Sequence, residues 1–215
     1  MNRRVQGPNI RSGISGLFLV IQPIYCPMSI SNQRQQIRQL IREKRQKLTA
    51  LEQAQAEQNI AQKALDAIEK FRAEHIALYL SFDGEISTKL LIEQLWQQEK
   101  KVYLPVLHPF SPGNLLFLAF QKDTPMHYNK FGILEPKLNV RNVLPVSHLD
   151  LIFTPLVAFD KDGNRLGMGG GFYDRTIQNW QKKSFVPVGL AHQIQEVERL
   201  PIESWDIPLA EILTG

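Results

Sequence analysis

Apolar residues recur three and four positions apart in two stretches of the chain, which is the period of an α-helix. In the first stretch they are Ile37, Leu40, Ile41 and Leu48. In the second they are Ile60, Ala64, Ile68 and Phe71. Ser31 can cap the first helix, and Thr49 followed by Glu52 is a capping-box pattern for the second. The pattern therefore predicts two amphipathic helices in succession.

Short apolar runs then alternate with helical stretches and with turns rich in proline, glycine and asparagine. The runs that predict strands are 76–80, 102–104, 115–120, 151–153 and 186–191. Further helices are expected through Leu90, Leu91 and Leu95, and over 174–181. Strands that are apolar along their length and alternate with helices are typical of a buried sheet. We expect an α/β fold, a single-domain layered α/β/α sandwich with a central mostly parallel or mixed sheet.

Composition narrows the possible classes of protein. The 215 residues are 43% hydrophobic and 21% charged, as in ordinary globular domains. The lone cysteine, Cys26, excludes a disulfide scaffold and a multi-cysteine metal site. The longest apolar runs fall short of the roughly 18–20 residues that a membrane-spanning helix needs. Because residues 1–33 hold three arginines and no acidic residue, the rest of the chain is nearly neutral, so neither a membrane nor a nucleic-acid partner is expected.

Residues 1–28 do not continue the folded pattern. The apolar run at 17–21 is shorter than the roughly 7–15 residues of a secretory signal, and no small residues precede Cys26 as a cleavage site would require. We interpret this segment as an N-terminal extension that an upstream start assignment adds before a true start at Met28; a disordered or targeting tail is the alternative. The folded domain is expected over 29–215, in the cytoplasm.

The most informative stretch is 163–175, Gly-Asn-Arg-Leu-Gly-Met-Gly-Gly-Gly-Phe-Tyr-Asp-Arg, in which four glycines occupy five positions. Such a loop before a helix exposes backbone N–H groups and suits a phosphate. It lacks the Gly-Lys-Ser/Thr of a P-loop, and Phe172 stands where a dinucleotide fingerprint has its last glycine. Arg165 stands where an EF-hand loop needs glycine. A flexible tight turn is the plain alternative, and the residues alone leave the ligand open among nucleotides and sugar phosphates.

Together with Pro-Leu-Val-Ala-Phe-Asp at 155–160, this motif closely resembles the signature of the 5-formyltetrahydrofolate cyclo-ligase family. The resemblance continues through Tyr-Leu-Ser at 79–81, Phe-Gly-Ile-Leu-Glu-Pro at 131–136 and Val-Gly-Leu-Ala at 188–191, and it covers the chain from residue 32 onward. It implies a ligase that uses ATP and Mg²⁺ to cyclise 5-formyltetrahydrofolate to 5,10-methenyltetrahydrofolate, releasing ADP and phosphate. Phosphorylation of the formyl oxygen turns a poor leaving group into a good one.

The resemblance also implies residue roles. The ATP-binding residues would be Arg34, Arg38, Arg165, Leu166, Gly167, Met168, Gly169, Gly170, Gly171, Phe172 and Tyr173. The folate would contact Leu80, Glu85, Met168, Gly169, Gly170, Gly171 and Phe172, and Mg²⁺ would bind Asp174 and Asp206. The family often has a basic residue at position 168, tyrosine at 172 and lysine at 34, so contacts that depend on those groups differ here.

Several residues carry alternative interpretations. Arg34, Arg38, Arg42 and Arg45 share one helix face, for which a solvated surface is the ordinary meaning. We expect Arg42 and Arg45 to be surface residues, and Leu80 could equally be core. Glu135 and Tyr103 are possible pocket residues without an assigned role, and no catalytic or metal-binding role is assigned to the five histidines. The competing functions are a non-catalytic phosphate- or folate-binding module and, less favoured, a nucleic-acid-binding helix; a monomer is expected.

Overall fold

The computed structural model describes residues 29–215. The prediction of an N-terminal extension with a start at Met28 concerns residues outside this range. Within the described range no helix is both long enough and apolar enough to span a membrane.

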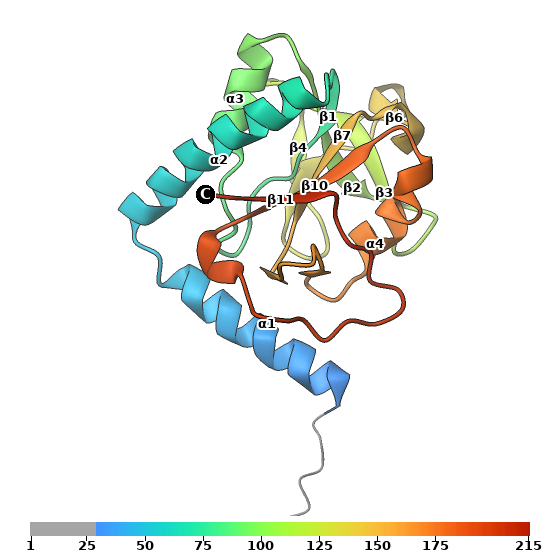
Figure 1. Ribbon diagram of the computed structural model, residues 1–215. Helices are drawn as coiled ribbons and strands as arrows, with labels where there is room; N and C mark the ends of the chain where they lie inside the picture. The colour runs from blue at the N-terminus through green and yellow to red at the C-terminus, as the bar shows by residue number, and fades with distance from the viewer. Residues whose placement is uncertain (1–28) are drawn as a thin grey trace, which may run out of the picture.

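A seven-stranded mixed sheet forms the centre of the described structure (Figure 1). Its strands lie in the order β11 (Glu211–Thr214), β10 (Val186–Ala191), β7 (Leu151–Pro155), β1 (His75–Ala77), β2 (Lys101–Leu107), β3 (Leu115–Ala119) and β6 (Val143–Leu144). The first five are parallel to one another, whereas β3 and β6 pair antiparallel at one edge. This arrangement confirms the expected mixed sheet.

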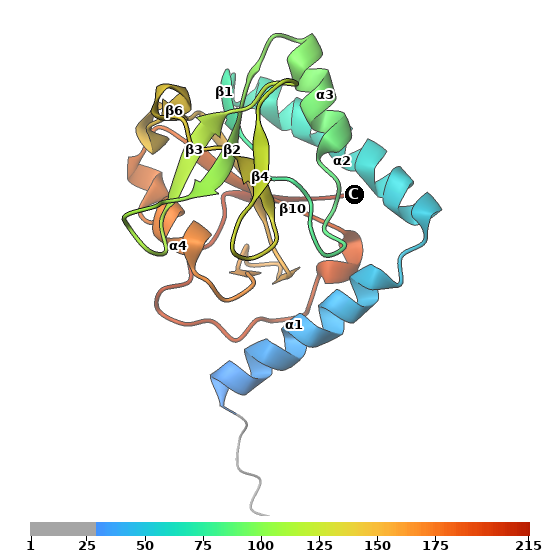
Figure 2. The same ribbon diagram turned by 180° about the vertical axis from the view of Figure 1, so that it is seen from behind.

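Helices cover both faces of the sheet, as seen in Figures 1 and 2. The helices α2 (Ala50–Lys70) and α3 (Lys89–Gln97) pack on one face, where Ile60 and Leu95 are buried against the strands. The short α4 (Phe172–Ile177) packs on the other face, together with Phe185 and Leu209 from the connections. The layered α/β/α architecture is therefore confirmed.

The helix α1 (Ile30–Gln46) lies outside these layers and crosses the end of the sheet where the parallel strands finish (Figure 1). Its Ile41 is buried against Val157 and Ala158, which directly follow β7. The predicted cap at Ser31 is wrong by two residues, because the side chain of Ser29 accepts the Asn32 N–H at 3.3 Å. The Thr49–Glu52 capping box of α2 is confirmed.

Two small hairpins complete the strands: β4 (Met126–Tyr128) with β5 (Leu134–Pro136), and β8 (Ala158–Phe159) with β9 (Arg165–Leu166). Single 3₁₀ turns occur at Val140–Asn142, Val146–His148, Trp180–Lys182 and Gln193–Gln195. The helix expected over 174–181 ends early, at Ile177, because Gln178 is extended and Asn179 has a φ of +57°. The glycine loop therefore leads into less than two turns of helix.

Candidate functional site

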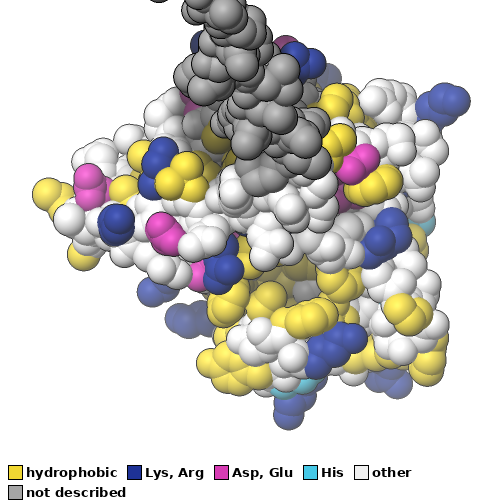
Figure 3. Space-filling model, turned by 90° about the horizontal axis from the view of Figure 1, so that it is seen from below, with side chains coloured by type: hydrophobic (Ala, Val, Ile, Leu, Met, Phe, Trp, Pro, Cys, Tyr) yellow, Lys and Arg dark blue, Asp and Glu magenta, His cyan; other side chains and the backbone are white. Residues whose placement is uncertain are grey.

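A cavity of about 800 Å³ opens where the strands β1, β2 and β7 end. Its walls come from α1, from the segments that follow these strands, from the turn of the β4–β5 hairpin, from the glycine loop and from residues 203–206. Figure 3 looks at this side of the molecule and shows hydrophobic side chains gathered in a hollow, with lysine and arginine side chains around it. Ligands of open α/β sheets bind at this end of the strands, which makes the cavity the candidate site.

The cavity brings together the residues predicted from the sequence, with one exception. Those that line it are Arg34, Arg38, Leu80, Glu85, Arg165, Gly167, Met168, Gly169, Gly170, Gly171, Phe172, Tyr173, Asp174 and Asp206. Leu166 is the exception, because its side chain is buried in the core against Ile41 and its carbonyl accepts the Val157 N–H at 2.7 Å.

The glycine loop offers backbone donors to this cavity. Among the described residues, the N–H groups of positions 168–171 have no hydrogen-bond acceptor. Gly169 has a φ of +99°, which a residue with a side chain rarely adopts. A methyl group on Gly170 would come within 2.6 Å of the Phe172 ring. The loop thus combines unused donors with positions that only glycine occupies without strain.

Arg38 holds this loop from α1. Its Nε donates to the Gly167 carbonyl at 2.8 Å, while the remainder of its guanidinium has no partner among residues 29–215. Burial, together with the neighbouring Arg34 cation, lowers the pKa of Arg38. Since an arginine side chain is effectively always protonated in proteins, the group stays charged and presents free donors to the cavity.

Two arginine–aspartate pairs form the wall beside the loop. Arg34 binds both carboxylate oxygens of Asp206, with 2.9 Å between Nη2 and Oδ1, and Arg165 Nη2 lies 2.7 Å from Asp174 Oδ1. Burial alone would raise the pKa of Asp206, but the bonds from Arg34 and from the Glu203 N–H outweigh burial and lower it. Asp206 is therefore held as an anion, and Asp174 lies beside the Arg165 guanidinium at the cavity wall.

Asp174 and Asp206 differ in the oxygens that they could offer to a magnesium ion. Asp174 Oδ2 has no partner within residues 29–215, whereas both oxygens of Asp206 are engaged. The described part of the chain holds no cluster of three or more histidine, cysteine, aspartate or glutamate side chains suited to a metal. Mg²⁺ typically needs only one or two carboxylates besides phosphate oxygens, and the free oxygen of Asp174 fits that need, whereas the oxygens of Asp206 already accept from Arg34 and from the Glu203 N–H.

Glu85 occupies the opposite wall, at the end of a tight turn after β1. Its carboxylate accepts the Phe82 N–H at 3.1 Å. Burial is the main reason that the pKa of Glu85 rises to about 7, and the Asp83 carboxylate adds to the effect. Glu85 is thus a partly desolvated acceptor that titrates close to neutral pH.

Tyr173 supplies a buried hydroxyl to the same cavity. Its oxygen has no hydrogen-bond partner among the described residues. Burial, and the nearby Glu85 carboxylate, raise the pKa of this phenol. A buried hydroxyl without a partner is unfavourable in the free protein, so this hydroxyl is a candidate to form a hydrogen bond with a ligand in the cavity.

The sequence predicted only some of the hydrophobic residues that line the 800 Å³ cavity. Phe131 packs edge-to-face on Phe172, with 6.2 Å between ring centroids, and Phe82, Ile133 and Trp205 also line the cavity. Phe131 and Ile133 belong to the Phe-Gly-Ile-Leu-Glu-Pro segment, so the resemblance had signalled their neighbourhood. No residue pattern singled out Phe82 or Trp205.

The prediction that Arg42 and Arg45 are surface residues is wrong for Arg45. Its side chain is fully buried, and Arg45 Nη2 lies 3.1 Å from Asp83 Oδ2. Arg42 stays partly exposed and binds the same carboxylate. The row of arginines on α1 (Arg34, Arg38, Arg42 and Arg45), here called the basic stripe, is thus compensated by Asp83 and Asp206. These carboxylates come from distant parts of the chain, so the spacing of residues within the helix does not reveal them.

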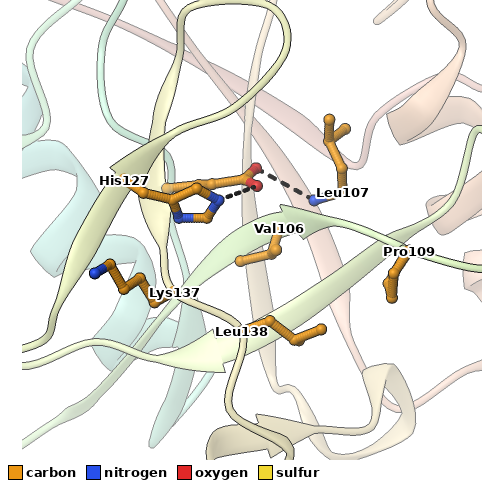
Figure 4. A pocket seen from close by; sticks show the side chains of 7 residues that line it. Val106, Leu107, Pro109, His127, Lys137 and Leu138 are labelled. Atoms are coloured by element: carbon orange, nitrogen blue, oxygen red, sulfur yellow. Dashed lines mark hydrogen bonds and ion pairs between the residues drawn. The ribbon is translucent and has the colours of Figure 1, made fainter.

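A second cavity of about 420 Å³ is lined by residues of the β4–β5 hairpin and by residues at the end of β2 (Figure 4). Glu135, which is buried, faces both cavities and accepts the Leu107 N–H at 3.3 Å and the Asn129 side-chain amide at 2.9 Å. His127 approaches the other oxygen of Glu135 at 3.6 Å. Glu135 therefore braces the hairpin turn, while Tyr103, the other possible pocket residue, is buried in the core with its hydroxyl 2.8 Å from His75 Nδ1.

Comparison with known proteins places this geometry in a family. The model of the 5-formyltetrahydrofolate cyclo-ligase family matches residues 30–215. A 5-formyltetrahydrofolate cyclo-ligase of Haemophilus influenzae is 67% identical over 185 residues, which cover 86% of this chain and 99% of that protein. The Escherichia coli K12 protein of the same name is 54% identical, covering 81% of this chain and 96% of that protein.

Solved structures agree with the sequence relatives. A 5,10-methenyltetrahydrofolate synthetase of Aquifex aeolicus superimposes with a TM-score of 0.70 at 28% identity, over 84% of this chain and 89% of that one. The corresponding synthetase of Mycoplasma pneumoniae gives a TM-score of 0.66 at 25% identity, over 83% and 96%. The chain belongs to the 5-formyltetrahydrofolate cyclo-ligase family, whose reaction is an ATP-dependent cyclisation.

Proposed function

We propose that the 800 Å³ cavity holds ATP and 5-formyltetrahydrofolate together and that its residues carry out the family's reaction in this chain. The observation that supports this proposal best is the set of unused N–H donors at 168–171 beside the free guanidinium of Arg38. Fixed donors of this kind stabilise the charge on a phosphoryl group in transfer.

The nucleotide half of the site would be the glycine loop and the arginine–aspartate wall. The loop N–H groups and Arg38 bind the terminal phosphates, and Arg165 keeps Asp174 oriented through their 2.7 Å bond. When bound, Mg²⁺ neutralises charge on the phosphates; Asp174 would hold the ion through its free oxygen, with Asp206 as the second carboxylate of the cavity wall. Arg34 serves mainly to fix Asp206, because its terminal nitrogens bind both oxygens of Asp206 and the Pro201 carbonyl.

The folate half would be Glu85 and the hydrophobic wall. The Glu85 carboxylate accepts hydrogen bonds from the amide and amine edge of the pterin, while Leu80, Phe131 and Phe172 contact its flat faces. This side of the site excludes water from the formyl group. The formyl oxygen attacks the terminal phosphorus of ATP and ADP leaves; the second folate nitrogen then attacks the formyl carbon, phosphate departs, and the proton of that nitrogen is released.

The test is a direct assay of turnover. Purified protein mixed with 5-formyltetrahydrofolate, ATP and magnesium is expected to generate the absorbance of the methenyl product, together with one ADP per product. Omission of ATP is the control. Binding of both substrates without product would instead support a non-catalytic binding module. The monomeric state, the cytoplasmic location and the absence of nucleic-acid or membrane partners stay predictions from the sequence.

A further inference from the structure

The turn that carries Glu85 holds two successive residues at positive φ. Asp83 has a φ of +52° and Gly84 a φ of +73°, and the Glu85 N–H donates to the Phe82 carbonyl at 3.0 Å. Two successive left-handed residues under such a bond define a type I′ turn, which here does not join two paired strands. Asp-Gly suits such a turn, because aspartate tolerates a positive φ better than most residues; what needs a partner from outside the turn is the Asp83 carboxylate.

The stabilising groups come from the last turns of α1. Asp83 accepts hydrogen bonds from Arg42 Nε, from Arg45 Nη2 at 3.1 Å and from the Gln46 side-chain amide at 3.1 Å. The bond from Arg42 is the main reason that the pKa of Asp83 is lowered, so the carboxylate stays charged. We name Arg42, Arg45 and Gln46 the Asp83 clamp.

The clamp is costly, which indicates that it serves more than stability. Arg45 is fully buried, and its Nε and Nη1 have no partner among the described residues. Replacing a buried ion pair with apolar side chains is often neutral or stabilising, so the pair is a poor device for stability alone. The turn also packs closely on the helix, since a methyl group on Gly84 would lie 3.4 Å from Arg45 Cβ.

We propose that Asp83 and its clamp are positioning residues that fix the Phe82–Glu85 turn, and with it the Glu85 carboxylate, for the folate. This inference rests on the proposed function of the cavity. It gives α1 two tasks: Arg38 in the middle of the helix contacts the glycine loop, while the clamp near the C-terminal end sets the folate wall. One rigid helix therefore fixes both halves of the site relative to each other.

The test is Asp83→Asn, assayed by steady-state kinetics with each substrate varied in turn. Asparagine keeps the size of the side chain and tolerates a positive φ, so the variant removes mainly the charge that the clamp binds. We expect KM for 5-formyltetrahydrofolate to rise about tenfold and KM for ATP to change less than twofold. The control is Glu211→Gln, which breaks an exposed ion pair with Lys70 away from the cavity and should leave both constants unchanged.

Glu85→Gln, measured in parallel, separates this inference from the proposed function. If Glu85→Gln raises the folate KM and Asp83→Asn does not, the positioning role is refuted and the proposed function stands. If neither raises it, the role of Glu85 and the inference fail together. An equal rise in both constants for Asp83→Asn would show a general structural defect and refute the inference. Should Asp83→Asn not fold, Arg42→Ala, at a half-exposed side chain, is expected to give the same selective rise with smaller size.

Discussion

Replacing Glu85 by glutamine is expected to make the protein more stable while making it a worse enzyme. Burial raises the pKa of this carboxyl from its ordinary 4.5 to about 7, so ionisation is less favourable in the folded protein than in the unfolded chain. Below pH 4.5 the group is protonated in both states. As the pH rises through 7, the folded protein must hold a partly desolvated charge, and the wild type loses stability that Glu85→Gln keeps.

The size of this effect follows from the pKa difference. At 1.36 kcal/mol for each pH unit, the shift corresponds to roughly 3 kcal/mol at most. Glu85 is only partly buried and faces the cavity, where water screens its charge, so about 1–3 kcal/mol is the reasonable range. The variant should gain this much free energy of unfolding over the wild type at pH 8, and none at pH 4.5.

Urea unfolding followed by tryptophan fluorescence, at a series of pH values from 4.5 to 8.5, measures this difference. The matched control is Glu211→Gln at an exposed ion pair, for which no comparable dependence is expected across this range. A constant stability difference between Glu85→Gln and the wild type at all pH values would refute the reasoning, because it would mean that Glu85 titrates with an ordinary pKa.

Three further substitutions test the nucleotide half of the site. Asp174→Asn should lower turnover at least a hundredfold at saturating ATP, measured by methenyl absorbance. It should be more stable to unfolding than Asp174→Ala, because its amide oxygen can still accept from Arg165. Full activity of Asp174→Asn would mean that the metal is held elsewhere. Arg38→Ala should raise KM for ATP about tenfold to a hundredfold, through loss of a charged donor and of the bond to Gly167, with little change in the folate KM. Tyr173→Phe should raise the free energy of unfolding of the free protein by about 1 kcal/mol, since it removes a buried hydroxyl that has no partner among the described residues. The same variant should bind ligand more weakly in titration calorimetry. A less stable variant would show that the hydroxyl already has a hydrogen-bond partner.

Local patterns in the sequence predicted the parts of the fold that local interactions form. The capping box at Thr49 and Glu52 and the apolar face of α2 depend on residues a few positions apart, and the structure confirms them. The face predicted for α1 is only half confirmed: Ile37 and Ile41 pack inward, but Leu40 is exposed and Leu48 lies beyond the end of the helix. The buried parallel strands are recognisable because both of their faces are apolar. The helix over 174–181 was overestimated because Asn179 takes a left-handed conformation, which helical periodicity does not report.

The site shows a similar division between local and distant contacts. The glycine loop is a continuous motif, so its residues were identified together, although Leu166 within it faces the core. Phe82 and Trp205 reach the same cavity from positions more than a hundred residues apart, and neither has a local signal. The partners of the α1 arginines could not be found from spacing, because Asp83 and Asp206 approach only after the chain has folded.

The approach of Asp83 and Asp206 explains the basic stripe of α1. Arg34 and Arg45 are eleven positions apart, which at 1.5 Å per residue separates them by about 16 Å along the helix. A nucleic-acid surface would leave such cations free along one face, whereas here each end is paired with a carboxylate from a different segment that lines or borders the cavity. Arg38, between them, is the member that has no carboxylate partner among the described residues, and it is the one that contacts the glycine loop. Under the proposed function, a charge pattern that looks like a solvated or polyanion-binding face forms the framework of a two-substrate site, and Arg38, the arginine without a carboxylate partner among the described residues, marks where phosphate is expected to bind.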